Sequence, residues 1–198
     1  MERNVPRATA AAFAFFFFCC VAFLAFFPAQ ERVQTPAAVF DPPLLITSVG
    51  QSPDVQLAVV LAKRAGLEHT LVKMATEKDL AGVKSVALVF GASLKGLGAA
   101  GVDTAKEKAR VRALLAEAAR RKIPVLGLHL GGDQRRGELT DEFVVEFLPA
   151  ADMAVIVKSA NKDGLFTRVC GAGSIPLVEV EKTADAADVL KNVFKPKA

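Results

Sequence analysis

Two glycine-rich loops hold the side chains of this chain that are best suited to bind an anion. The first loop covers residues 91–101 and the second covers residues 129–137, and each follows an apolar stretch typical of a buried strand. Glycine lets backbone N–H groups come close to a ligand, while lysine and arginine neutralise its charge. The two loops therefore predict a pocket for a small phosphorylated or carboxylated molecule.

Cationic side chains occur in both loops. The second loop has two adjacent arginines, Arg135 and Arg136, and the first has Lys95. A guanidinium group can form a planar fork onto a carboxylate or a phosphate, so we expect at least one arginine to contact the ligand. An ion pair with Glu138 or Asp141 is the structural alternative for the arginines, and a solvated loop charge is the alternative for Lys95.

His129 and Asp133 are the two candidates for acid–base chemistry, because both lie where the fourth expected strand gives way to its loop. Histidine changes its charge near neutral pH and is therefore suited to proton transfer. His129 fits two other roles as well, a hydrogen-bond donor to the ligand or a core histidine bonded to a backbone carbonyl. The sequence leaves these three roles open.

Polar residues that follow the other expected strands join the same set. The carboxyl ends of parallel strands meet at one edge of a sheet, so their loops should share a crevice. The expected ligand-binding residues are Ser48, Gln51, Ser93, Lys95, Gly96, Gly98, His129, Gly131, Gly132, Arg135, Arg136, Asn161 and Asp163.

Other chemistries lack their residue patterns. Gly96 to Gly101 matches G-x-G-x-x-G, the pattern of a dinucleotide site. In such a site the first glycine directly follows the strand and an acidic residue ends the next strand, but here residues 91–95 intervene and that acidic residue is missing. A Walker A loop is excluded because Lys95 precedes Gly96. His69 and His129 belong to different strand regions and no cysteine pair accompanies them, so we expect no metal and no cofactor.

The composition argues against nucleic acid as a partner. The formal net charge is only +4 at pH 7, the basic residues form no long run, and the chain has no Trp or Tyr. Nucleic-acid sites combine a basic patch with aromatic stacking platforms, and both are lacking after the N-terminal segment. The expected partner is a small anionic molecule, and the oligomeric state stays open.

Residues 1–29 are expected to be a signal peptide or a membrane anchor. Residues 8–27 carry no charge, follow Arg3 and Arg7, and as a helix would span about 30 Å, the thickness of the hydrocarbon core of a bilayer. The arginines should stay in the cytoplasm, which places the rest of the chain in the periplasm or at the cell surface. The membrane is a partner if this segment is not cleaved.

Residues 30–43, which contain three prolines, are expected to be a linker.

The remaining residues, 44–198, predict a single α/β domain. Apolar runs between turn residues indicate strands over 44–47, 69–73, 85–90, 123–128, 153–157 and 175–180. A first helix is expected after Ser52, which would be its cap, with Pro53 in the first position. Further helices are expected over 103–121, over 141–147 with Thr140 as the cap, and over 184–194, and a helical turn is expected near Leu165. This alternation predicts a three-layer, Rossmann-like or flavodoxin-like domain with a mainly parallel sheet of five or six strands.

The sequence from Leu44 to the last helix resembles a family of uncharacterised exported bacterial proteins, classed as a domain of unknown function. The loops 91–101 and 129–137 and the segment 161–166 carry the resemblance. It implies a bacterial, extracytoplasmic setting, and it transfers no catalytic residue.

Two functions from different classes are compatible with these patterns. The first is a binding domain that holds a small anionic metabolite at the carboxyl edge of the sheet. The alternative is a hydrolase or transferase acting on such an anion, with His129 or Asp133 as acid or base. A nucleotide-binding oxidoreductase has less support because its motif is incomplete.

Overall fold

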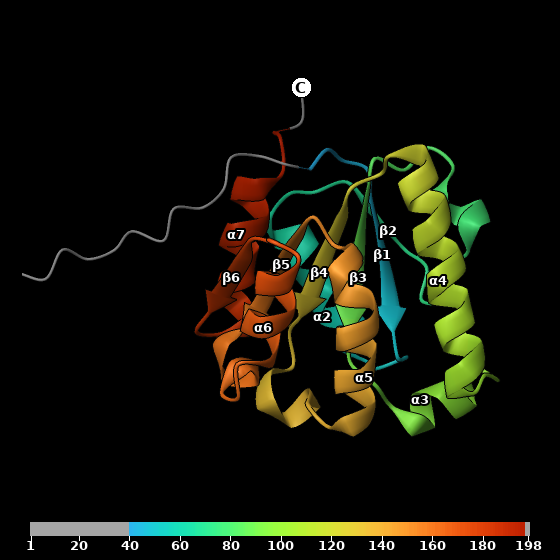
Figure 1. Ribbon diagram of the computed structural model, residues 1–198. Coiled ribbons are helices and arrows are strands. Elements are labelled where there is room, and N and C mark those ends of the chain that lie inside the picture. Colours follow the sequence, from blue (N-terminus) through green and yellow to red (C-terminus); the bar gives the residue numbers. More distant parts are fainter. Residues whose placement is uncertain (1–39, 197–198) are drawn as a thin grey trace, which may run out of the picture. The chain divides into compact units, whose positions relative to one another are not determined.

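A sheet of six parallel strands forms the centre of the molecule (Figure 1). The computed structural model describes residues 40–196. The strands follow the order β2-β1-β3-β4-β5-β6, and β1 and β3 pair over six residues each. Their bounds are β1 (Leu44–Val49), β2 (His69–Leu71), β3 (Ser85–Phe90), β4 (Val125–His129), β5 (Met153–Val157) and β6 (Leu177–Val180).

Helices cover both faces of this sheet. Two of them, α2 (Val55–Arg64) and α7 (Ala186–Val193), pack on one face, and three, α4 (Thr104–Arg121), α5 (Glu138–Phe147) and α6 (Leu165–Ala172), pack on the other (Figure 1). A short helix, α3 (Leu94–Ala99), lies at the carboxyl edge. The prediction of a three-layer α/β fold with a parallel sheet is confirmed.

The strand sequences explain why both faces are covered. Every residue of β1, β3, β4 and β5 is buried, so these strands alternate between two apolar cores rather than between a core and water. Along β1, for example, Leu44 and Ile46 belong to the core under α2 and α7, while Leu45 and Val49 belong to the core under α4, α5 and α6.

The strand order sets the position of a ligand crevice. The chain leaves β1 through α2 on one face to reach β2, and it leaves β3 through α4 on the other face to reach β4. The loops that follow β1 and β3 therefore diverge to opposite faces of the sheet. In open parallel sheets, ligands bind at this kind of switch point, outside the carboxyl ends of the strands.

Several local expectations need correction. The structure forms a helix at α3, where the sequence predicts a glycine-rich loop, because Ser93 caps its first turn by accepting a hydrogen bond from the Gly96 N–H at 3.0 Å. The helix α6 is eight residues long, where a single turn near Leu165 is expected. Strand ends differ by a few residues, as in β4, which begins at Val125 and includes His129.

Two expected helix caps are also wrong. The Oγ of Ser52 accepts the Asp54 N–H at 3.2 Å, and α2 begins only at Val55. Thr140 lies inside the first turn of α5, where its Oγ1 accepts the Ala92 N–H at 3.0 Å and so ties α5 to the loop after β3.

Residues 40–43 pack on the domain, although the sequence places them in the linker. The ring of Phe40 is fully buried and stacks on Phe194 with 5.3 Å between the ring centroids. Backbone hydrogen bonds join Phe40 to Val193 and Lys195, and Lys195 pairs with Asp41 at 2.9 Å. The single large apolar side chain in this proline-rich stretch accounts for the difference.

The expected signal peptide or anchor in residues 1–29, and residues 30–39 of the expected linker, lie outside the described residues. Within residues 40–196, no helix combines the length and the apolar character needed to cross a membrane.

Packing in the core under α4 should contribute strongly to the stability of the domain. Replacing Leu114, which is fully buried on α4, by alanine should lower the free energy of unfolding by about 2–5 kcal/mol, since it removes apolar contacts and leaves a cavity. Leu94→Ala is the matched control: with 75% of its surface exposed, Leu94 should contribute about 0.5 kcal/mol or less. Urea denaturation of both variants measures the two values, and equal losses would contradict the assignment of the core.

Candidate functional site

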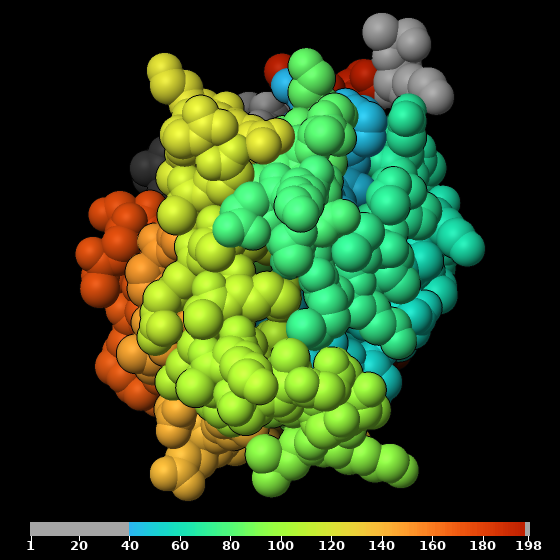
Figure 2. Space-filling model, turned by 90° about the vertical axis from the view of Figure 1, so that its right-hand side faces the viewer, coloured from blue at the N-terminus to red at the C-terminus, as the bar shows by residue number. Residues whose placement is uncertain are grey.

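The carboxyl edge of the sheet contains a cleft of about 550 Å³ between the loops after β1 and β2 and the helix α3. Its volume lies within the range of small-molecule sites. Ten residues line it: Gln51, Ser52, Pro53, Lys73, Met74, Ser93, Lys95, Gly96, Ala99 and Ala100. The cleft thus adjoins the switch point between β1 and β3. Figure 2 shows the face on which the segment after β2, in teal, lies beside α4, in yellow-green.

Two lysines give this cleft its charge. Lys73 comes from the segment after β2 and Lys95 from the first turn of α3, and no acidic residue is among the lining residues. Within residues 40–196, neither ammonium group forms an ion pair with a carboxylate. The lining therefore carries a formal charge of +2 that the described part of the chain does not neutralise locally.

Gly96 allows α3 to lie directly against the loop after β1. A Cβ atom at this position would come within 2.0 Å of the backbone oxygen of Gln51. Gln51 itself has a positive φ of 60°. The glycine that the sequence predicts as a ligand contact thus has a packing role, because it sets the distance between two walls of the cleft.

A buried ion pair on α4 connects the loop after β1 to a third wall, the segment after β2. Glu107, whose side chain has no exposed surface, accepts hydrogen bonds from the Gly50 N–H at 3.1 Å and from Gln51 Nε2 at 2.9 Å. Arg110 donates to the same carboxylate from Nε at 2.9 Å and from Nη2 at 2.8 Å. It also donates to the backbone oxygens of Ser48 and Ala75, at 2.6 and 2.7 Å. The pair therefore joins the loop after β1 to the segment after β2.

The backbone of Lys73 is anchored to the same region. Its carbonyl oxygen accepts hydrogen bonds from Thr47 Oγ1 at 3.1 Å, from the Ser48 N–H at 3.2 Å and from Gln51 Nε2 at 3.4 Å. The exposed lysine side chain thus starts from a fixed backbone position.

Burial alone raises the pKa of Glu107, but hydrogen bonds and charge from Arg110, with the donors of Gln51 and Gly50, outweigh burial. The pKa of this carboxyl group therefore lies below its ordinary value of 4.5. Glu107 stays ionised at neutral pH and can hold Arg110.

The loop after β4 lies at the same edge, but it is held by internal contacts. Arg135 donates from Nε to Oδ1 of the buried Asp54 at 3.0 Å, and its two Nη atoms have no hydrogen-bond partner within residues 40–196. A Cβ on Gly131 would come within 2.4 Å of Asp54 Oδ2, so this glycine makes room for the carboxylate. Gly132, with a φ of 62°, supplies the turn.

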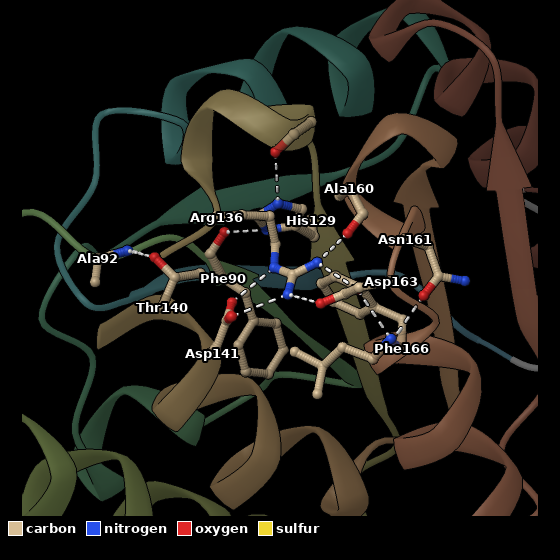
Figure 3. Close-up of polar contacts among 12 residues, drawn as sticks. Phe90, Ala92, His129, Arg136, Thr140, Asp141, Ala160, Asn161, Asp163 and Phe166 are labelled. Carbon is tan, nitrogen blue, oxygen red and sulfur yellow. Dashed lines mark hydrogen bonds and ion pairs between the residues drawn. The ribbon is translucent and has the colours of Figure 1, made fainter. Parts of the chain in front are cut away.

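Arg136 forms the structural ion pair that the sequence leaves open as an alternative. Its Nε donates to Asp141 at 2.6 Å, and its Nη2 donates to Asp163 at 2.9 Å (Figure 3). The guanidinium group also contacts the backbone oxygen of Ala160. The guanidinium carbon, Cζ, lies 5.5 Å from the centroid of the Phe166 ring. The hydrogen bond from Arg136 lowers the pKa of Asp163. Arg136 thus joins the start of α5 to the loop before α6.

His129 is a core histidine. It has no exposed surface, and its Nδ1 and Nε2 lie 3.1 Å from the backbone oxygens of Phe90 and Gly132 (Figure 3). Burial lowers the pKa of this imidazole, although both carbonyl contacts oppose the shift. Asp133 lies on the surface and pairs with Lys162 at 2.8 Å. Neither candidate for acid–base chemistry lines the cleft.

The other expected site residues have mixed positions. Gln51, Ser93, Lys95 and Gly96 line the cleft, whereas Gly98 lies on α3 outside the lining. Ser48 is fully buried, and its Oγ has no partner within residues 40–196. Asn161 Oδ1 accepts the Phe166 N–H at 2.9 Å, so this side chain organises the start of α6.

Sequence reasoning misses Lys73, Met74, Asp54, Glu107 and Arg110 as parts of the carboxyl edge. The position of Lys73 at the end of an expected strand is a signal that could have identified it. The two charged residues on α4 have the i, i+3 spacing of an ordinary surface pair, and only the packing of α4 against the sheet shows that they are buried.

Comparison with known proteins identifies the family. The model of the family described as domain of unknown function (DUF6305) matches residues 41–194, so the chain belongs to this family. No curated protein matches the chain.

Two solved structures are similar to parts of this fold. A putative lipolytic protein of the G-D-S-L family from Desulfitobacterium hafniense DCB-2 has 12% sequence identity and a TM-score of 0.35, over 69% of this chain and 75% of that one. The SGNH-hydrolase family esterase AlinE4 has 14% identity and a TM-score of 0.30, over 78% of this chain and 82% of the esterase.

Residues 40–196 contain no group of three or more His, Cys, Asp or Glu side chains that could hold a metal ion.

Removing the charge of Glu107 should destabilise the domain in a pH-dependent way. Glu107→Gln leaves Arg110 nearly buried without its anionic partner, which should cost about 3 kcal/mol or more at pH 7. Because the folded pKa of Glu107 is lowered, the stability that its charge provides is complete above pH 4.5 and is lost as the pH falls through the folded pKa. The difference between wild type and variant in urea denaturation should therefore shrink below pH 4.5.

Glu181→Gln is the control for this measurement. It breaks an exposed ion pair with Lys158, so it should change stability far less at every pH. A Glu107→Gln difference that stays constant down to pH 3 would contradict the role of the Glu107 charge.

The close approach at Gly96 predicts opposite effects for two neighbouring glycines. Gly96→Ala should destabilise the protein by about 1–3 kcal/mol, because the new Cβ meets a backbone oxygen that cannot move away cheaply. Gly98→Ala should stabilise it by up to about 1 kcal/mol, since its Cβ meets nothing within 4 Å and alanine favours the helix. Thermal denaturation of the two variants gives the signs, and a neutral Gly96→Ala would mean that α3 does not contact the loop after β1.

Proposed function

We propose that this protein is a binding domain that holds a small anionic molecule in the cleft between β1, β2 and α3. The observation that carries the proposal is the charge of the lining: Lys73 and Lys95 face a cleft of about 550 Å³ whose lining has no acidic residue. Other cations of this edge, such as Arg136 and Lys162, are paired with carboxylates. Within residues 40–196, Lys73 and Lys95 have no such carboxylate partner.

The remaining hydrogen-bonding capacity of the lining favours the same class of ligand. Ser52 Oγ and Ser93 Oγ each accept a backbone N–H, which leaves each hydroxyl proton available for donation. Gln51 Nε2 is used internally by Glu107 and by the carbonyl of Lys73. Ammonium and hydroxyl donors together suit a group that only accepts hydrogen bonds, such as a carboxylate or a phosphate.

Binding rather than catalysis is the function that these contacts support. His129 is buried away from solvent and Asp133 is held by Lys162, so neither provides an acid or a base to a ligand in the cleft. The cleft itself offers cations and hydroxyl donors. A domain that captures an anion needs no more than these.

The setting that we propose is outside the cytoplasmic membrane. It is based on residues 8–27, which are uncharged and follow Arg3 and Arg7, and on the positive-inside rule. A substrate-capturing domain in the periplasm or at the cell surface would meet its ligand in solution.

Loss of either cleft lysine should weaken anion binding. In calorimetric titration of the purified full chain with inorganic phosphate, Lys73→Ala and Lys95→Ala should each raise the dissociation constant about tenfold or more, since a hydrogen bond to a charged group contributes roughly 1.5–3 kcal/mol. Raising the salt concentration should weaken wild-type binding, because both lysines are exposed to solvent.

Lys84→Ala is the matched control, since it removes an exposed lysine just before β3, at the opposite edge of the sheet. It should bind phosphate as the wild type does. Equal affinities in all four proteins, or no binding by the wild type, would contradict the proposed function.

A further inference from the structure

We infer that the ligand of this cleft is an anionic group on a short, non-aromatic aliphatic chain, that is, an alkyl phosphate or an alkyl carboxylate. The inference rests on the proposed function, because it assigns the anionic group to Lys73 and Lys95. It goes further by naming what the rest of the cleft binds.

The walls beside the lysines are aliphatic. Pro53, Met74, Ala99 and Ala100 line the cleft together with Lys73 and Lys95. Met74 is half-buried, and its flexible thioether side chain adapts to an apolar partner. An aliphatic chain in contact with these side chains would leave water, which favours binding in proportion to the apolar area that is buried.

The same lining disfavours a nucleotide. It contains no Phe, and the chain has no Trp or Tyr at all. In sites for single-stranded nucleic acid, stacking of a base on an aromatic side chain contributes about 1–3 kcal/mol for each base. A phosphate attached to a nucleoside would find the cations of this cleft but no surface for its base.

A sugar phosphate is disfavoured for a different reason. Sugar hydroxyls need several hydrogen-bond partners, but the amide Nε2 of Gln51 is used internally, and the proposed function assigns the free hydroxyl protons of Ser52 and Ser93 to the anionic group. Polar groups that leave water without new hydrogen bonds lower the affinity. An aliphatic chain has no such groups, so it loses no hydrogen bonds to water on entering the cleft.

A series of linear alkyl phosphates, from ethyl to hexyl, tests this inference in the purified full chain. Each added methylene that enters the cleft should lower the dissociation constant about threefold to fourfold. The matching series of alkyl carboxylates tests the other head group, and a slope in either series supports the inference. Adenosine monophosphate and glucose 6-phosphate should bind no more tightly than inorganic phosphate.

Two variants separate the head group from the chain. Met74→Ser should reduce the gain for each methylene by more than it changes the affinity for inorganic phosphate, because it removes an apolar wall and no charge. Val60→Ser is the control, since Val60 is an apolar residue of α2 with 53% of its surface exposed and lies outside the cleft lining. It should leave both quantities unchanged.

The outcomes distinguish this inference from the proposed function. Suppose that phosphate binding depends on Lys73 and Lys95, but the affinity does not rise with chain length in either alkyl series. This result would overturn the inference and leave the proposed function intact. Adenosine monophosphate binding more tightly than hexyl phosphate would also overturn it. Absence of lysine-dependent binding for every anion would overturn both.

Discussion

The buried ion pair between Glu107 and Arg110 is the constraint on which the cleft depends. It lies on α4, yet its hydrogen bonds reach the loop after β1 through Gly50 and Gln51, and the segment after β2 through Ala75. Two charges inside a protein are favourable only when each is well hydrogen-bonded, and here the carboxylate accepts from three residues. The pair therefore fixes two walls of the cleft relative to each other while α3 supplies the third.

The edge of the sheet is divided by charge into two parts. Around the loops after β4 and β5, acids neutralise the cations, as Asp54 does for Arg135 and Asp141 and Asp163 do for Arg136. Beside β1 and β2, the lysines of the cleft have no such partners within the described residues. The first part is a framework, and the second is available to a ligand.

The sequence predicts the fold better than it predicts the site. Apolar runs such as residues 85–90 and 153–157 identify strands that are buried on both faces, and their alternation with helices implies a parallel sheet. The carboxyl edge follows from that topology, and Gln51, Ser93, Lys95 and Gly96 do lie in the cleft. Contacts between distant segments, such as Arg136 with Asp163 or Glu107 with Gln51, depend on packing that no local pattern encodes.

The most direct measurement is a crystal structure of the protein with hexyl phosphate. Our account predicts the phosphate within hydrogen-bond distance of the ammonium groups of Lys73 and Lys95, with the alkyl chain against Met74. A phosphate bound instead to Arg135, or a chain directed away from the cleft into solvent, would contradict it.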